Sequence, residues 1–249
     1  MSGVVVTAPV AERAWALPSW YRHLAEQTQP PTEIILLHSG HKGDETWQAI
    51  ENCAAEFGIR THRLHDPSIP HQRHDNARFV TLARLRNQLL STAKIVTDCD
   101  VLFSLDTDIM LEDTTTIERL VPVAETFGVA SPLLYLHPEM KWTVNAGMLD
   151  EARQLESAAP DVIPREELEK WPWCRAAPTP AALAGAAVQP IDVPMAAIVM
   201  SREVFASTRY GNHESGEDIA FGIALKKHGH RAMWVPSIEA RHVWDEKSL

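Results

Sequence analysis

Short apolar runs alternate with longer stretches of helical periodicity through the first half of the chain, and this alternation restricts the fold more than any other feature of the sequence. Strands joined by helices of this length pair in parallel, and a parallel sheet has to be covered by helices on both faces. The sequence therefore predicts an α/β fold with a mainly parallel central sheet flanked by helices. The expected strands are Val4–Thr7, Ile34–Leu37, Ile59–Leu64, Val101–Leu105, Phe127–Tyr135, Ala196–Met200 and Ala232–Val235.

Local signals mark the ends of several helices between these strands. Gly58 and Gly229 each follow a segment of helical spacing, and glycine is the residue that most often ends a helix. Thr115 and Glu118 have the spacing of a capping box, which predicts a helix start there. The expected helices are Trp20–Gln27, Trp47–Phe57, Asn76–Ala93, a segment that follows Thr115, and Ile219–His228.

A proline-rich insertion interrupts the second half of the chain. Six prolines fall between Ala158 and Pro190, in a stretch that is otherwise rich in alanine. Long segments of this kind are commonly lids, binding loops or disordered. Trp171 and Trp173 lie in its middle, where they would either stack on the ring of a bound ligand or anchor the loop to the body of the protein.

Composition excludes some functions. The formal net charge of −10 gives no basic surface for a phosphate backbone, so nucleic acid is not expected as the main partner. The cysteines, Cys53, Cys99 and Cys174, are scattered, which is typical of free thiols in a reducing compartment. No run is apolar over the ~18–20 residues of a membrane-spanning helix, and the first residues lack the basic region of a signal peptide. We therefore expect a cytoplasmic protein without a transmembrane segment.

Two Asp-x-Asp triplets flank the Val101–Leu105 strand. Asp98 and Asp100 precede it, whereas Asp106 and Asp108 follow it. Ligands of open parallel sheets bind beyond the carboxyl ends of the strands, which favours the second triplet as a site. In an extended segment both carboxylates would point to one side and repel each other unless a cation lay between them. Mg²⁺ or Mn²⁺ shared with substrate phosphates is one explanation, and a solvated turn is the other.

A second group of polar residues follows near the end of the chain. Glu217 and Asp218 open a helix, and His242 follows the last expected strand. Carboxylates in a first helical turn are favoured by the helix dipole, and a single histidine is usually structural. Each residue therefore has an ordinary explanation when it is considered alone. Their order after the Asp106–Asp108 triplet favours a shared function.

In this order the residues resemble those of the GT-A-fold glycosyltransferases, close to family 2 and to the Anp1-like mannosyltransferases. The resemblance covers most of the chain, and its most specific part is the ordered set Asp106/Asp108, Glu217/Asp218 and His242. It also includes Val4–Thr7, Gln29–Glu33 before the Ile34–Leu37 strand, the Arg84–Asn87 segment and Gly216.

The resemblance implies a metal-dependent transfer of a sugar, most simply a hexose, from a UDP- or GDP-sugar to an acceptor hydroxyl. Asp108 would be a ligand of Mn²⁺ or Mg²⁺, and Asp106 would contact the donor ribose or the metal. His242, reached from the C-terminal tail, would be a further metal ligand. Asp218 would act as general base, and Glu217 would orient it.

The same resemblance implies one GT-A domain, with a donor-binding half at about 1–113 and an acceptor half at about 114–249. Further nucleotide contacts are expected from the first loop, the second strand and the Asn76–Ala93 helix. Two departures stand out: His38 occupies the region where relatives carry a base-reading aspartate, and Met195–Ala197 stands where they often have glycines. The expected nucleotide contacts are Pro9, Arg13, His38, Arg84, Arg86 and Asp106.

Two other functions are alternatives to this one. A nucleotidyltransferase needs a glycine-rich basic loop after the first strand, and Ala8–Arg13 contains no glycine. A non-catalytic nucleotide-sugar-binding module would keep the fold without the chemistry. The acceptor stays open between a small metabolite, a lipid head group, a protein and a modified nucleobase.

Overall fold

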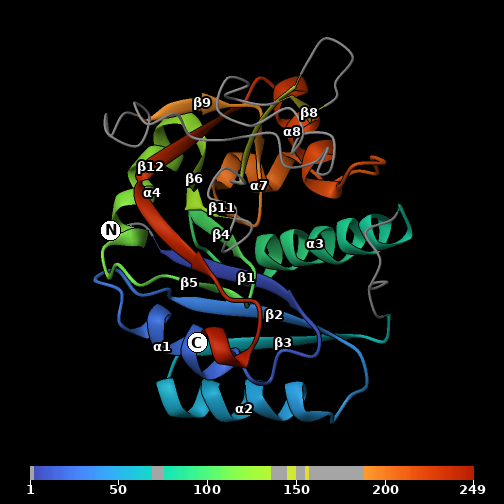
Figure 1. The fold of residues 1–249 in the computed structure, drawn as a ribbon, viewed down its shortest axis with the longest axis vertical. Helices are drawn as coiled ribbons and strands as arrows, with labels where there is room; N and C mark the ends of the chain where they lie inside the picture. Colours follow the sequence, from blue (N-terminus) through green and yellow to red (C-terminus); the bar gives the residue numbers. More distant parts are fainter. Residues whose placement is uncertain (1–2, 69–75, 136–144, 150–154, 157–187) are drawn as a thin grey trace.

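The computed structural model describes residues 3–68, 76–135, 145–149, 155–156 and 188–249, and a nine-stranded sheet forms its centre (Figure 1). The strand order is β3-β2-β1-β4-β11-β6-β12-β5, and β9 pairs with β12. These strands are β1 (Val4–Val10), β2 (Glu33–Ser39), β3 (Arg60–Asp66), β4 (Val101–Leu105), β5 (Ile109–Met110), β6 (Gly128–Leu134), β9 (Gln189–Ile191), β11 (Ala197–Ser201) and β12 (Arg231–His242).

The sheet is mainly parallel, as predicted, but an antiparallel strand lies inside it. β3, β2, β1 and β4 run parallel to one another, and β12 runs parallel to β6. β11 lies antiparallel between β4 and β6, with Ala197 opposite Leu105. The turn that leads into β11 is therefore at the same edge of the sheet as the carboxyl end of β4.

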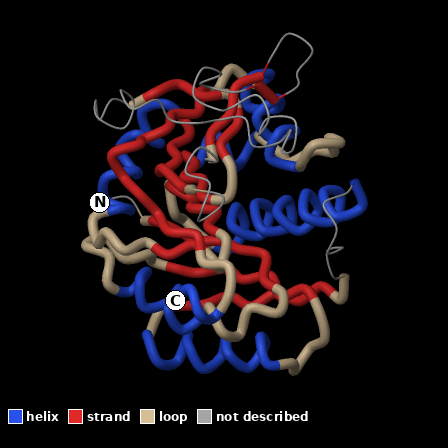
Figure 2. Tube along the Cα trace, in the orientation of Figure 1, coloured by secondary structure: helices blue, strands red, loops and turns tan. Residues whose placement is uncertain are grey.

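Helices cover both faces of the sheet, as Figure 2 shows. Alternate strand residues point to opposite faces, so that Val4 and Val6 of β1 belong to one hydrophobic cluster and Val5 to the other. Among the described residues, no helix combines the length and the apolar character that a membrane span requires. α1 (Leu17–Ala25), α2 (Glu45–Phe57) and α4 (Thr116–Phe127) pack on the first face, and α3 (Asn76–Val96), α7 (Arg202–Ser207) and α8 (Glu217–Lys227) on the second.

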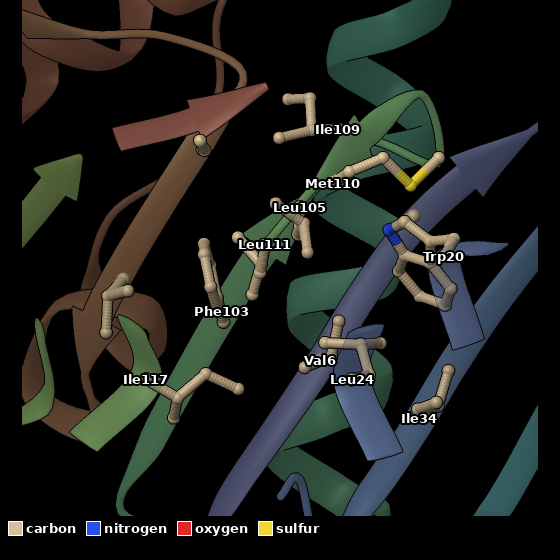
Figure 3. Packing of buried hydrophobic residues seen from close by; sticks show 14 of the residues in the cluster. Val6, Trp20, Leu24, Ile34, Phe103, Leu105, Ile109, Met110, Leu111 and Ile117 are labelled. Carbon is tan, nitrogen blue, oxygen red and sulfur yellow. The ribbon is translucent and has the colours of Figure 1, made fainter. Parts of the chain in front are cut away.

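The core of the first face joins α1 and α4 to the central strands. Figure 3 shows Trp20 and Leu24 of α1 pointing toward Val6 and Ile34 of the neighbouring strands, with Phe103 of β4 close by. These five side chains are buried. Because burying such a side chain contributes about 1.5–3 kcal/mol, this packing holds the strand ends that carry the polar residues in place.

A small second sheet packs against α8. It consists of β7 (Ala146–Leu149), β8 (Leu155–Glu156) and β10 (Val193–Pro194). Gly222 permits the contact, because a Cβ atom at this position would lie 2.5 Å from the carbonyl oxygen of Asp192. The proline-rich insertion lies outside the described residues up to position 187, and so do Trp171 and Trp173.

β1 and β12 are both longer than predicted, because each continues past the proline at which the predicted strand ended. β1 continues through Pro9, which pairs with Leu37. This is possible because β4 pairs with β1 only as far as Thr7, so that the missing N–H of Pro9 interrupts no bond to β4. β12 continues past Pro236 to His242, and an irregularity in its register between Val235 and Glu239 accommodates this proline.

The predicted capping box at the start of α4 is wrong. Thr115 is the N-cap residue, but its side chain makes no capping hydrogen bond. Its hydroxyl donates instead to Asp113 at 2.7 Å, and Glu118 accepts from the hydroxyl of Thr28 at 2.6 Å. The side chain of Gln27 accepts from the N–H of Ile117, so a distant residue satisfies the helix terminus.

Candidate active site at the carboxyl ends of β1 and β4

Polar side chains from several elements meet where β1 and β4 end. The backbone N–H of Asp106 donates to the carbonyl of Ala196 at 3.2 Å, which brings the turn before β11 to the end of β4. The N–H of Val243 donates to the carbonyl of Asp108 at 2.8 Å, which brings the segment after β12 to the same place. The Asp106–Asp108 segment, the turn before β11 and the end of β12, which carries His242, therefore lie together at one edge of the sheet.

Asp106 and Asp108 lie in a turn, contrary to the expectation of an extended segment. A hydrogen bond from the N–H of Ile109 to the carbonyl of Asp106, at 3.1 Å, folds these residues into a turn. The turn is needed because Ile109 already belongs to β5, which pairs with the end of β12. The two carboxylates consequently have different partners.

Asp108 lies between two potential cations. Its Oδ2 is 3.3 Å from Nη2 of Arg13 and 3.7 Å from Nε2 of His242. Thr46, at the start of α2, accepts from the N–H of Arg13 at 3.1 Å and so fixes the loop after β1. Burial acts to raise the pKa of Asp108, but hydrogen bonding and charge from His242, together with the charge of Arg13, lower it below its ordinary value.

His242 is the last residue of a strand and is not in a C-terminal tail as predicted. It pairs with Ile109 of β5, so the backbone hydrogen bonds of the sheet set its position. Its Nδ1 is buried and has no hydrogen-bond partner, and its ring lies 4.2 Å from that of Trp244. The imidazole is therefore held beside Asp108 with an unused nitrogen.

A carboxylate oxygen of Asp108 and a nitrogen of His242 suit a divalent cation. An imidazole ligand favours a transition metal such as Mn²⁺ over Mg²⁺, which prefers oxygen ligands. Within the described part of the chain, no group of three or more histidine, cysteine, aspartate or glutamate side chains has the arrangement of a metal site. Asp106, the third predicted ligand, is paired with Arg86. Phosphate oxygens and water would have to complete the coordination of a metal at Asp108 and His242.

Arg86 is at the centre of a second polar group. Its Nη1 and Nη2 donate to the two carboxylate oxygens of Asp106 at 2.9 and 3.0 Å. Its Nε lies 3.3 Å from Oε1 of Glu217, and Nη1 donates to Ser104 at 3.4 Å. The residue is only 5% exposed, and its guanidinium carbon is 5.6 Å from the centre of the Tyr210 ring. Arg86 thus links the end of β4 with the start of α8.

Asp218 follows Glu217 in the first turn of α8. Its Oδ1 is buried without a hydrogen-bond partner, and its carboxylate accepts from the backbone N–H of Ala196. Burial raises the pKa of Asp218 well above its ordinary value, and the charges of Glu217 and Asp106 add to this effect. A carboxyl group of raised pKa at the edge of the sheet has the properties of a proton acceptor for a bound hydroxyl.

Ala196 is in a strained turn between these carboxylates. Its φ is +63°, and the N–H of Ala197 donates to the carbonyl of Met195 at 2.7 Å, which closes a three-residue turn. γ-Turns with positive φ are rare for residues other than glycine. The turn directs the Ala196 N–H to Asp218 and its carbonyl to the N–H of Asp106. Backbone strain of this kind gathers at functional sites, and here it fixes two site residues relative to each other.

Replacing Ala196 with glycine is expected to raise the free energy of unfolding by about 1 kcal/mol, because relief of the left-handed conformation outweighs the greater chain entropy of glycine. Chemical denaturation of both proteins measures the difference. Ala197→Gly is the matched control, since Ala197 is an ordinary strand residue of β11 and its replacement should destabilise the protein. Equal losses of stability in the two variants would show that Ala196 is not strained.

Of the other predicted nucleotide contacts, Pro9 and His38 lie near the ends of β1 and β2, and Arg84 lies on α3. His38 is fully buried, and its Nε2 hydrogen-bonds to Asp44, the N-cap residue of α2. Arg84 donates twice to Asp66 at the end of β3, at 2.5 and 3.2 Å, and these bonds hold the pKa of Asp66 far below its ordinary value. Pro9 is a residue of β1.

Two positioning residues were not predicted from the sequence. Asn145, which is fully buried, accepts from the N–H of Leu134 and donates to Ser131 and to the carbonyl of Met195, and so supports the strained turn. Thr46 holds the Arg13 loop. Ser131 is the sequence feature that could have indicated the role of Asn145. A lone hydroxyl inside a buried apolar strand needs a hydrogen-bond partner, and Asn145 is that partner.

No protein-family model matches the sequence, and no curated protein matches it either. Solved structures do resemble it. The mannosyltransferase PcManGT from Pyrobaculum calidifontis, in complex with GDP-Man and Mn²⁺, has a TM-score of 0.57 and 15% identity, over 97% of this chain and 56% of that chain. GalNAc-T7 with UDP, GalNAc and Mn²⁺ has a TM-score of 0.67 and 15% identity, over 98% of this chain and 44% of that chain.

A third similar structure is glucosyl-3-phosphoglycerate synthase from Mycobacterium tuberculosis, in complex with Mn²⁺, UDP and glucosyl-3-phosphoglycerate. Its TM-score is 0.50 at 15% identity, over 98% of this chain and 73% of that chain. Together these structures confirm that the chain has the GT-A fold. The chain spans only 56% of the length of the mannosyltransferase and 44% of that of GalNAc-T7.

Proposed function

We propose that this GT-A-fold chain is a metal-dependent glycosyltransferase that transfers a hexose from a UDP- or GDP-sugar to an acceptor hydroxyl. The observation that carries the proposal is the meeting of two groups at one edge of the sheet. Asp108, His242 and Arg13 form one group, and Asp106, Arg86 and the Glu217–Asp218 turn form the other. The first has the chemistry to hold a metal and diphosphate, and the second has the chemistry to accept a proton.

The similar structures support this assignment. The mannosyltransferase holds GDP-Man and Mn²⁺, GalNAc-T7 holds UDP, GalNAc and Mn²⁺, and the synthase holds UDP, Mn²⁺ and a glucosylated product. These complexes favour a nucleoside-diphosphate sugar as the donor and Mn²⁺ as the metal. The proposal includes a donor-binding half at about 1–113, which supplies Arg13 and Asp108, and an acceptor half at about 114–249, which supplies Asp218.

Each residue then has a defined role. Asp108 and His242 hold the metal, which when bound stabilises the negative charge of the departing nucleoside diphosphate. Arg13 lies where its guanidinium can pair with a phosphate oxygen. Asp218 accepts the proton of the acceptor hydroxyl as its oxygen bonds to the anomeric carbon and the bond from that carbon to the diphosphate oxygen breaks.

Nucleotide binding tests the proposal directly. Thermal unfolding is measured with GDP, UDP, ADP and CDP, each with and without Mn²⁺. The matching nucleotide, at 100 times its Kd, is expected to stabilise the protein by about 2.7 kcal/mol, and only when Mn²⁺ is present. The choice between GDP and UDP is read from the same experiment. No stabilisation by any of the four would contradict the proposal.

Hydrolysis of the corresponding nucleotide-sugar then separates an enzyme from a binding module. The nucleotide-sugar is incubated with the protein and Mn²⁺, without an acceptor, and release of nucleoside diphosphate is followed. We expect slow release that stops when EDTA removes the metal. Binding without any release, also in the presence of candidate acceptors, would indicate a module that keeps the fold alone.

A further inference from the structure

Arg86 contacts carboxylates from both halves of the proposed site. Its two terminal nitrogens hold Asp106 after β4, and its Nε faces Glu217 at the start of α8. The guanidinium is planar and rigid, so groups bound along its edges have a fixed relative orientation. Only 5% of Arg86 is exposed, so its guanidinium faces other protein groups and not solvent.

The neighbouring residue of α3 makes a second connection to the same region. Asn87 donates to the carbonyl of Tyr210 at 2.8 Å and accepts from its N–H at 2.9 Å. The Tyr210 ring in turn stacks on Phe221 of α8, with the ring centres 4.4 Å apart. Two consecutive residues of α3 therefore hold both the loop that leads into α8 and the first turn of α8.

The charges explain why an arginine is needed at this place. Asp106, Glu217 and Asp218 are close enough for their charges to raise the pKa of Asp218, and Arg86 is the cation that opposes this effect. Without a buried cation the carboxylates repel one another, and the start of α8 would move away from β4. Lysine could supply the charge, but it could not hold Asp106 and Glu217 in one plane.

We propose that Arg86 is a positioning residue that sets the distance between the donor-side Asp106 and the helix that carries Asp218. The inference rests on the proposed function, since it takes Asp218 as the group that receives the acceptor proton. In this role Arg86 contacts Asp106 and Glu217, in place of the nucleotide contact expected from the sequence. It acts through Glu217 and Asp106, so its loss should affect turnover more than nucleotide affinity. Misplacement of a reacting group by about 1 Å can cost roughly 100-fold in rate.

The test compares Arg86→Lys, Glu217→Gln and the double variant with wild type. Arg119→Lys is the matched control. Arg119, on α4, also pairs with an aspartate, Asp113, at 3.0 Å, but both side chains of this pair are about 40% exposed. We expect Arg86→Lys to lower turnover roughly 10- to 100-fold, with the Kd of the Mn²⁺–nucleotide complex unchanged. Glu217→Gln should lower turnover as well. The double variant should be no slower than Arg86→Lys, because both substitutions disrupt the same contact between Arg86 and Glu217.

Two kinetic results would overturn the proposal. Multiplied effects in the double variant would mean that Arg86 and Glu217 act independently. A loss of nucleotide affinity in Arg86→Lys as large as its loss of turnover would assign Arg86 to donor binding.

A structural readout keeps this inference separate from the proposed function. Hydrogen exchange of the amides in the first turn of α8 is expected to be faster in Arg86→Lys than in Arg119→Lys, whether or not any nucleotide-sugar is turned over. Unchanged exchange in that turn would contradict the positioning role. If exchange is faster in Arg86→Lys but the wild-type protein binds no nucleotide, the positioning role of Arg86 between α3 and α8 is supported and only the glycosyltransferase assignment is contradicted.

Discussion

Replacing Asp218 with asparagine is expected to lower turnover by about 10²–10⁴-fold, the range typical for loss of a positioned proton acceptor. The amide keeps the shape of the carboxyl group and can still accept from the N–H of Ala196. It cannot take a proton. Burial and the neighbouring carboxylates raise the pKa of Asp218, which makes its ionised form the stronger base. Nucleotide affinity should not change, since Asp108 and His242 lie in the other polar group.

Three measurements on this variant distinguish the possible roles of Asp218: turnover, nucleotide Kd and the unfolding temperature. If Asp218 served only the first turn of α8, asparagine would replace it with almost no loss of activity or stability. A retaining mechanism predicts a third result, a modest loss that high pH does not rescue. Glu203→Gln, in the first turn of α7, is the matched control, because it removes an exposed carboxylate from the same helical position.

Asp108→Asn is expected to weaken Mn²⁺-dependent nucleotide binding by more than about 100-fold. Loss of a group that merely orients a metal ligand already costs 10- to 100-fold in affinity, and Asp108 is proposed to be a ligand itself. In the absence of metal the variant should remain folded, because Asp108 is at a strand end and contributes nothing to either hydrophobic cluster. Calorimetric titration of the preferred nucleoside diphosphate, with and without Mn²⁺, measures the effect.

Asp100→Asn provides the control for this experiment. Asp100 belongs to the other Asp-x-Asp triplet, at the amino end of β4, and is exposed. The two substitutions make the same chemical change at opposite ends of one strand. Equal nucleotide affinity in both variants would exclude Asp108 as a metal ligand and would leave the carboxyl end of β4 without a donor site.

Local signals in the sequence were sufficient for much of the fold. The limits of β4 were predicted because four of its five residues are apolar and an aspartate stands at each end. Two helices end at glycines, as expected. Gly58, with φ of +65°, is the C-cap residue of α2, and Gly229, with φ of +76°, follows the C-cap residue of α8. The resemblance to GT-A enzymes predicted the fold that the structural comparisons confirm, whereas the placement close to family 2 stays a prediction.

Features that depend on distant residues could not be predicted. The partner of Arg86 in α8 lies 131 residues away along the chain, so the sequence predicted a nucleotide contact for Arg86 and not this ion pair. The turn at Asp106–Asp108 exists because β5 pairs with β12, and an extended segment was the wrong expectation. An alanine in the sequence gives no indication of positive φ, which is why the strain at Ala196 was visible only in the structure.

The antiparallel placement of β11 has a consequence for synthesis of the chain on the ribosome. β3, β2, β1 and β4 can pair as soon as the first part of the chain has emerged, since each of them finds its neighbour within that part. β4 then has a free, apolar edge until β11 is translated, after the whole proline-rich insertion. Unpaired edges of this kind promote aggregation, and distant pairings form slowly. A nascent chain that is halted before β11 is therefore the form of this protein in which the edge of β4 is most exposed to aggregation.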